Sequence, residues 1–249
     1  MRQRLVQLGV LVGLLGVWQA VVLAGLVKPS LLPAPTTVAA ALAKVLGDRD
    51  VVRGLQVTAL EVAITVLLTV PLAVLLGMAI GESARATRWL APLFNFLTAV
   101  PKSIFLPLFI LALGVGINQK VAFGVFQAAF VILVATIAAV QGVPRSLVLA
   151  ARAMGARRHQ IYWHVYLPHM LPVVLQGVRI GVVFGITGIV LAEMYVTREG
   201  FGRFITLWGT AYQMPELLAG VVILGGATIL INELLRAYER RAGRWRVQE

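Results

Sequence analysis

Few residues in this sequence could support catalysis or metal binding. The 249 residues include three His, ten Asp and Glu, and no Cys. His159, His164 and His169 are five residues apart, so on a helix they drift around the axis instead of sharing the one face that metal ligands need. A phosphate-binding glycine loop of the P-loop type is absent from the sequence, so this chain does not itself hydrolyse a nucleotide. The sequence therefore predicts no catalytic residue and no metal site.

The composition places the chain in a lipid bilayer. It is 59% hydrophobic and 13% charged, with a mean hydropathy of +0.90, which is more apolar than a water-soluble domain can hide in its core. In a soluble protein, a net charge of +12 would suggest nucleic acid as a partner. Here the basic residues form small clusters between apolar stretches, as in the cytoplasmic loops of membrane proteins, so no nucleic-acid partner is expected.

About six spanning helices are expected, which predicts an all-α membrane protein. The first apolar stretch follows basic residues as in a signal peptide, but its length indicates an uncleaved helix. A short surface helix is expected over Val38 to Leu46. The stretches long enough to span are Leu5 to Val27, Val57 to Ile80, Leu93 to Leu113, Val121 to Val140, Val173 to Val196 and Leu217 to Leu235.

Small residues recur at four-residue spacing in two of these stretches. Gly77 and Gly81 lie at the end of the second stretch, and Gly177, Gly181 and Gly185 lie in the fifth. Such ladders let helix backbones approach closely within a membrane. We expect them to pack against helices of the same chain, with a subunit interface as the alternative.

The distribution of basic residues predicts the orientation. Of the 22 Lys and Arg residues, 13 lie in the two termini and in the loops Gly81 to Pro92 and Val143 to Pro172, and seven lie in the opposite loops. Because Lys and Arg favour the cytoplasmic side, both termini are predicted to be cytoplasmic. Arg179, in the fifth stretch, is expected to extend its side chain to the cytoplasmic face.

The loop between the fourth and fifth stretches has the pattern of a docking hairpin. Ala150 to Met154 forms a short helix with a smooth face, and Gly155 permits a left-handed turn. A second, amphipathic helix is expected over Ala156 to Tyr166, ended by Leu167-Pro168. The alternative is an interfacial helix lying on the lipid headgroups, which would also favour Trp, Tyr and Arg.

This loop resembles the EAA motif of ABC-importer permeases, which reads Glu-Ala-Ala, three residues, Gly, nine residues, Ile, one residue and Leu-Pro. The spacing fits without a gap, with Leu149 in place of the Glu and Val165 in place of the Ile. Further stretches narrow the likeness to the nitrate, sulfonate, taurine and bicarbonate branch. They are Leu31 to Thr36, Val100 to Lys102, Leu106 to Phe109, Gly114 to Gly116, Ala192 to Met194 and Gly200 to Gly202.

The resemblance implies a type I ABC-importer permease fold in the bacterial cytoplasmic (inner) membrane. It implies one transmembrane domain over residues 1–249, with its core over 57–235 and a cytoplasmic coupling loop over 143–172. The implied partners are a second copy of the permease, two cytoplasmic ATPase subunits that bind the ATP and Mg, and an extracytoplasmic substrate-binding protein. The residues expected to dock the ATPase are Ala150, Ala151, Gly155, Ala156, Arg157, Val165, Leu167 and Pro168.

Charged residues within the spans suggest the solute pathway, because charges in lipid face a cavity or each other. Lys102, with its neighbour Ser103, lies between Pro101 and Pro107, where a broken helix exposes backbone groups that must be buried or line water. A cation there suits an anionic solute. Glu193 is the second candidate, and the alternative for Lys102 is snorkelling or an ion pair with Glu193.

Other functions remain open at this point. The same type of importer could carry an aromatic carboxylate or a pyrimidine vitamin precursor, because selection rests largely with the binding protein. A membrane-embedded enzyme would use the loop His and Arg residues, but an acid and base at one membrane depth are missing from the sequence. A secondary transporter would need no ATPase, although this chain is short for one.

Overall fold

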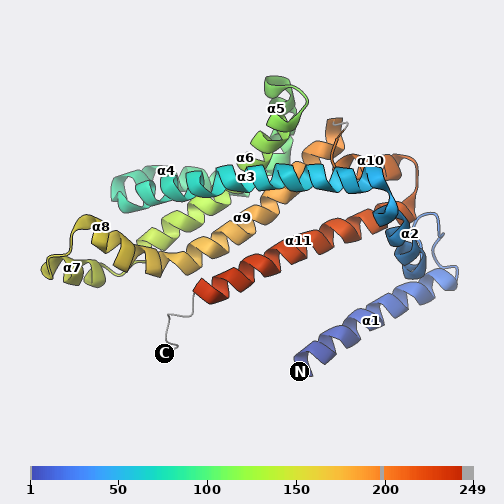
Figure 1. Cartoon of the computed structure of the whole chain (residues 1–249), viewed down its shortest axis with the longest axis horizontal. Helices are drawn as coiled ribbons and strands as arrows, with labels where there is room; N and C mark the ends of the chain where they lie inside the picture. The colour runs from blue at the N-terminus through green and yellow to red at the C-terminus, as the bar shows by residue number, and fades with distance from the viewer. Residues whose placement is uncertain (1, 197–198, 243–249) are drawn as a thin grey trace. The chain divides into compact units, whose positions relative to one another are not determined.

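The computed structural model describes residues 2–196 and 199–242, which form helices and connecting turns without any strand (Figure 1). The described elements are α1 (Arg2–Leu23), α2 (Pro35–Gly47), α3 (Arg49–Glu82), α4 (Ala84–Ala99), η1 (Lys102–Phe105), α5 (Leu106–Leu113), α6 (Ile117–Gln141), α7 (Arg145–Ala153), α8 (Arg158–Ile161), η2 (Tyr162–Tyr166), α9 (Leu167–Val196), α10 (Gly202–Thr210) and α11 (Met214–Ala242). The predicted all-α class is confirmed.

The chain forms two compact units. The first comprises residues 1–58 and 193–227, and the second comprises residues 59–192 and 228–249. The single domain over residues 1–249 stays a prediction.

Four helices are long and apolar enough to cross a membrane: α3, α6, the continuous run Arg158–Tyr195 and the part of α11 over Met214–Ala237. The bent pair formed by α4 and by η1 with α5 makes a fifth candidate. In α1 the apolar helical stretch, Gly9–Leu23, is shorter than a span. The described residues thus support four or five of the six expected spans, and the cytoplasmic placement of both termini stays a prediction.

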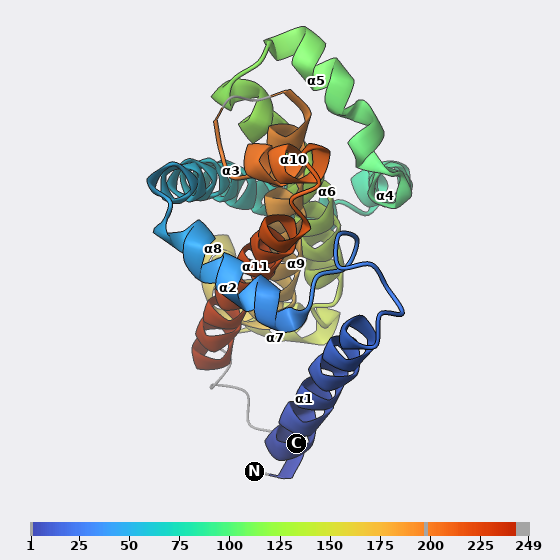
Figure 2. The same ribbon diagram turned by 90° about the vertical axis from the view of Figure 1, so that its right-hand side faces the viewer.

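The third expected span is broken, as the two prolines predict. The chain bends by 88° between α4 and the helical stretch Lys102–Leu113, and Figure 2 shows α5 turning away from α4. Val100, just before Pro101, has an extended backbone (φ −68°, ψ 136°), because the proline ring excludes the helical conformation at the residue before it. This break creates the short helix η1, on which Lys102 lies.

In the second unit, helices α3, α6 and α9 meet at glycines. A side chain at Gly177 would collide with Ala135, and one at Gly181 with Ile132; both contacts lie on α6. On α3, a Cβ at Gly77 would lie 2.6 Å from the Cβ of Thr136. Lipid provides no hydrophobic drive for association, so this close backbone approach supplies the attraction. The predicted packing of the ladders within one chain is confirmed.

In the first unit, an apolar cluster joins α2 to α10. The buried face of the predicted surface helix, here α2, consists of Val38, Ala41 and Val45. Lys44, beside this face, is exposed and pairs with Glu216 at 3.1 Å. Helix α10 was not expected, because its residues lie in a loop between two apolar stretches. It forms because Phe201, Phe204, Ile205 and Trp208 pack into the same cluster.

Candidate functional site

The loop between α6 and α9 folds as the expected hairpin. Helix α7 ends at Ala153 and the chain turns at Gly155, whose φ is +79°. The Ala156 amide donates to the Ala151 carbonyl at 3.0 Å, and the Gly155 amide donates to the Arg152 carbonyl at 2.9 Å. These two bonds form a Schellman cap, which needs a left-handed residue and therefore favours glycine. The prediction of a left-handed turn at Gly155 is confirmed.

The second half of the hairpin differs from the expectation. Helix α8 begins at Arg158, where the Arg157 amide donates to the Gln160 side chain at 2.7 Å. The helix does not end at Leu167-Pro168, as the sequence suggested, but continues through the π-helical turn η2 into α9. Pro168 lies in the first turn of α9, and the wider π turn, in which the Leu167 amide donates to the Tyr162 carbonyl, accommodates the proline within a continuous helix.

A hollow of about 410 Å³ lies between the two arms of the hairpin. It is lined mainly by small and apolar side chains, and among the predicted docking residues it brings together Ala151, Gly155, Ala156 and Val165. Ala150 and Arg157 are exposed beside it, and Leu167 and Pro168 begin α9. The remaining lining residues, which lie outside the predicted docking set, are Met154, Gln160, Ile161 and His164.

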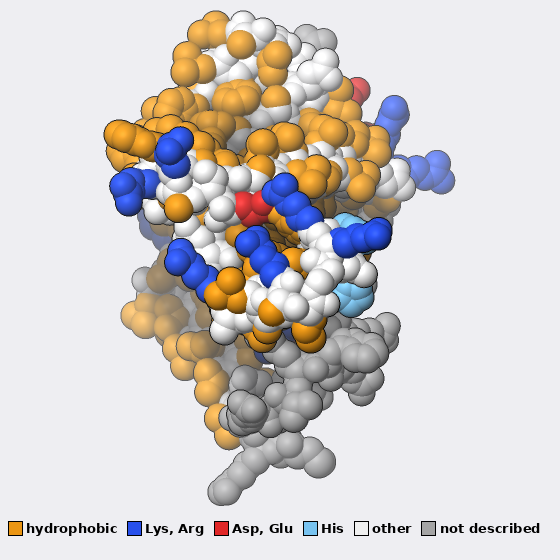
Figure 3. Space-filling view, turned by 90° about the vertical axis from the view of Figure 1, so that its left-hand side faces the viewer, with side chains coloured by type: hydrophobic (Ala, Val, Ile, Leu, Met, Phe, Trp, Pro, Cys, Tyr) orange, Lys and Arg blue, Asp and Glu red, His pale blue; other side chains and the backbone are white. Residues whose placement is uncertain are grey.

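The surface around this hollow combines exposed apolar and basic side chains. Leu149, Met154 and Trp163 are 63%, 82% and 67% exposed, and Figure 3 shows Lys and Arg side chains gathered on the face that carries α7 and α8. A group of exposed apolar residues suits either a protein interface or the lipid headgroups. Leu149, in place of the motif Glu, adds apolar surface here and no charge.

The hairpin is held to its own unit by polar contacts. Arg158 pairs with Glu82, at the end of α3, at 3.5 Å. A ring nitrogen of His169 lies 3.1 Å from the Gly142 carbonyl, and one of His164 lies 2.9 Å from the Gln160 carbonyl. Two of the three His residues thus have local backbone contacts within the hairpin.

Lys102, the predicted pathway cation, is buried. Its side chain lies on η1 with the residue only 5% exposed, and its ammonium is 5.2 Å from the centre of the Phe184 ring. Among the described residues of the second unit, it has no carboxylate partner at ion-pair distance. Its neighbour Ser103 is exposed. The helix break thus places a desolvated cation beside a ring face that attracts it.

Glu193, the second pathway candidate, has a structural place in the first unit. Its carboxylate accepts hydrogen bonds from the Thr58 hydroxyl and from the Gly202 amide, each at 2.7 Å. Thr58 in turn accepts from the Phe201 amide at 2.8 Å. Glu193 and Thr58 therefore cap the amino end of α10, where a negative charge is favoured. The suggested pairing of Lys102 with Glu193 stays a prediction.

Two buried or half-buried ion pairs were missed by the sequence reasoning. Lys120, counted as a loop residue, lies in the first turns of α6 and pairs with Glu61 of α3. Arg179, expected to snorkel, pairs with Glu239 of α11 at 3.6 Å. The pairing of Glu61 could have been expected from the sequence, because an acidic residue inside an expected span requires a partner.

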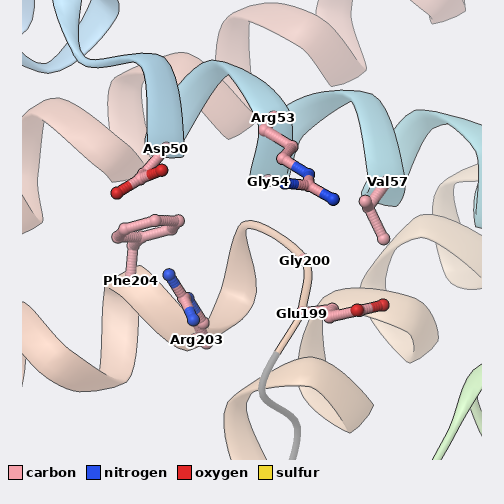
Figure 4. Close-up of a pocket in the computed structure, with 8 residues that line it drawn as sticks. All are labelled: Asp50, Arg53, Gly54, Val57, Glu199, Gly200, Arg203 and Phe204. Carbon is pink, nitrogen blue, oxygen red and sulfur yellow. The ribbon is translucent and has the colours of Figure 1, made fainter.

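A second hollow, of about 270 Å³, lies in the first unit (Figure 4). Asp50 and Arg53 reach it from α3, Glu199 from the segment before α10, and Arg203 from the first turn of α10. The Arg203 guanidinium lies 4.6 Å from the centre of the Phe204 ring. Charges of both signs line this hollow, so it offers polar contacts without a strong field of one sign.

Comparisons with known proteins agree with the helical fold. The model of the family described as binding-protein-dependent transport system inner membrane component matches residues 60–244, and this chain belongs to that family. It is 29% identical to the taurine transport system permease protein TauC of Escherichia coli (strain K12), over 98% of this chain and 90% of that protein.

Two further likenesses extend this result. The chain is 28% identical to the putative aliphatic sulfonates transport permease protein SsuC of Bacillus subtilis (strain 168), over 94% of this chain and 84% of that protein. Its fold resembles a chain of the inward-facing MetNI methionine ABC transporter, with a TM-score of 0.62, 23% identity and coverage of 79% of this chain and 95% of that one.

The protein is therefore the membrane permease subunit of an ABC importer and not itself an enzyme. It resides in the bacterial inner membrane as a multi-pass protein, and its family implies an ATPase and a substrate-binding protein as partners. The resemblance to ABC-importer permeases of the nitrate, sulfonate, taurine and bicarbonate branch is confirmed.

Proposed function

We propose that this permease imports a small sulfonate such as taurine, as a homodimer that docks two ATPase subunits through its α7–α8 hairpin. The observation that carries the substrate class is the likeness, over nearly the whole chain, to permeases for taurine and aliphatic sulfonates. The buried Lys102 supports it, because a sulfonate is anionic and a desolvated cation attracts it strongly.

The hairpin has the features that coupling requires. Its hollow can receive a side chain of the ATPase, and its exposed Leu149, Met154 and Trp163 can be buried at the same interface. ATP and Mg are bound by the ATPase. When ATP binding draws the two ATPases together, the docked hairpins follow, and the spans change from inward-facing to outward-facing. A nucleotide shifts this equilibrium only through contacts that differ between the two states, and the hairpin supplies them.

The substrate proposal is tested with the complete transporter and the binding protein encoded beside this chain. Taurine or an alkanesulfonate is expected to raise the melting temperature of the binding protein and to be taken up by proteoliposomes that contain ATP. Nitrate, bicarbonate, an aromatic carboxylate and a pyrimidine are the comparison ligands. If one of these ligands raises the melting temperature of the binding protein and no sulfonate does, the proposed substrate is wrong. Uptake without ATP would instead indicate a secondary transporter.

The role of Lys102 gives a separate prediction. Lys102→Met is expected to raise the KM for sulfonate uptake at least about tenfold, because a hydrogen bond to a charged group contributes about 1.5–3 kcal/mol. Lys102→Arg keeps the charge and is expected to stay within a few-fold of the wild-type KM. Uptake kinetics in proteoliposomes measure both. An unchanged KM in Lys102→Met would show that Lys102 does not contact the solute and serves only in packing within the protein.

A further inference from the structure

The buried ion pair between Glu61 and Lys120 has no part in the function proposed above. Its two side chains are only 1% and 3% exposed. Both lie on helices long and apolar enough to cross a membrane, Glu61 on α3 and Lys120 on α6. In such surroundings a carboxylate and an ammonium are costly to separate, because neither water nor lipid headgroups replace the lost partner.

The helix surfaces next to this pair are smooth. One turn farther along each helix, Thr65 of α3 faces Gly124 of α6: a Cβ on Gly124 would lie 3.0 Å from the Thr65 hydroxyl and 3.0 Å from Ile189 of α9. A Cβ on Gly185 of α9 would lie 3.6 Å from the Thr65 methyl group. Next to the ion pair, helices α3, α6 and α9 therefore meet through small residues, which allow close approach.

The small side chains next to the ion pair do little to fix the register between the helices at this depth. In lipid there is no hydrophobic drive between helices, so packing and polar contacts decide how they align. An ion pair is directional, and sliding one helix along the other would separate its charges. We propose that Glu61 and Lys120 are a positioning pair that fixes α3 against α6, so that the two helices move as one block during transport. This inference depends on the transporter class and not on the substrate.

The first test uses the absence of cysteine from the chain. The variant is Thr65→Cys/Gly124→Cys. A Cβ at position 124 lies 3.0 Å from the γ atoms of residue 65, which is close enough for sulfur atoms at the two positions to form a disulfide bond. If α3 and α6 move together, the oxidised transporter is expected to take up solute within twofold of the same variant reduced by dithiothreitol. Loss of uptake on oxidation, restored by reduction, would overturn the proposal, because it would show that these helices move past each other.

The second test separates positioning from stability. Replacing a buried ion pair with apolar residues is often neutral or stabilising. Glu61→Leu/Lys120→Met is therefore expected to yield folded permease with an unchanged or higher melting temperature, but to take up solute at least fivefold more slowly while ATP hydrolysis persists. The exchanged pair, Glu61→Lys/Lys120→Glu, restores a directional contact and is expected to recover uptake.

The exposed pair Lys44 and Glu216 provides the matched control, because Lys44 is 76% exposed. Lys44→Met/Glu216→Leu is expected to keep both folding and uptake. Wild-type uptake by the apolar replacement at positions 61 and 120 would show that the pair contributes stability alone, which would contradict a positioning role.

Discussion

Uptake by Gly155→Asp is expected to fall at least about a hundredfold while the permease stays folded in the membrane. The left-handed conformation at Gly155, with φ of +79°, costs about 1–2 kcal/mol for most other residues. The larger effect comes from the site itself. A Cβ at position 155 meets no atom of this chain within 4 Å, and the residue lines the hairpin hollow, so a carboxylate there occupies the space that the ATPase needs.

Two variants test the cause of this loss. Asn and Asp are nearly the same size and both tolerate the left-handed conformation, so a loss of uptake in Gly155→Asn would assign the effect to bulk in the hollow and not to the negative charge. Gly25→Asp introduces a carboxylate at another positive φ, +71°, also in open space but outside the hairpin segment, and is expected to transport normally. Uptake and retention of the co-expressed ATPase by membranes are both measured. Docking through this hairpin would be refuted by two results together. Gly155→Asp would take up solute normally, and membranes that contain the wild-type chain would retain no ATPase.

Gly200→Ala is expected to lose most of its folded protein. Gly200 has φ of +100°, and a Cβ there would collide with the carboxylate of Glu193. Moving that carboxylate would break its hydrogen bonds to Thr58 and to the Gly202 amide, which cap α10. Strain and lost hydrogen bonds to a charged group together cost about 3 kcal/mol or more. Melting in detergent and the yield of monodisperse protein measure the loss.

Two comparisons make this prediction specific. Gly47→Ala, in the last turn of α2, meets no atom within 4 Å and is expected to melt like the wild type. Glu193→Gln keeps an acceptor for the cap and is expected to lower stability with the KM unchanged. A changed KM with full stability would instead place Glu193 in contact with solute, as the sequence first suggested, and wild-type melting of Gly200→Ala would refute the cap.

Local sequence rules predicted the hairpin well because its decisive residues act locally. The backbone freedom of Gly155 and the apolar run before it imply a helix, a turn and a second helix without knowledge of any distant contact. The same rules failed at Pro168. Proline usually ends a preceding helix, but the wider turn at η2 lets the helix continue, and the pattern of residue types does not reveal that choice.

Long-range contacts could not be predicted from spacing. Lys120 follows two glycines and is charged, which indicates a loop, yet its pairing with Glu61 of α3 allows it to be buried in α6. Helix α10 likewise has little local signal, and it forms because Glu193 and Thr58 cap it and aromatic residues bury its face. In each case a partner far away in the sequence offsets the cost that the local pattern indicates.

The sequence by itself determined that this chain lies in a membrane, that it belongs among the ABC-importer permeases, and that its hairpin turns at Gly155. These properties follow from apolar length, motif spacing and local backbone preference, which are all written along the chain. Only the tertiary structure decided that Lys102 is buried beside Phe184, that Glu193 caps α10 and that Glu61 pairs with Lys120. A charge in an apolar helix requires a compensating contact, and which residue supplies it depends on how the helices pack.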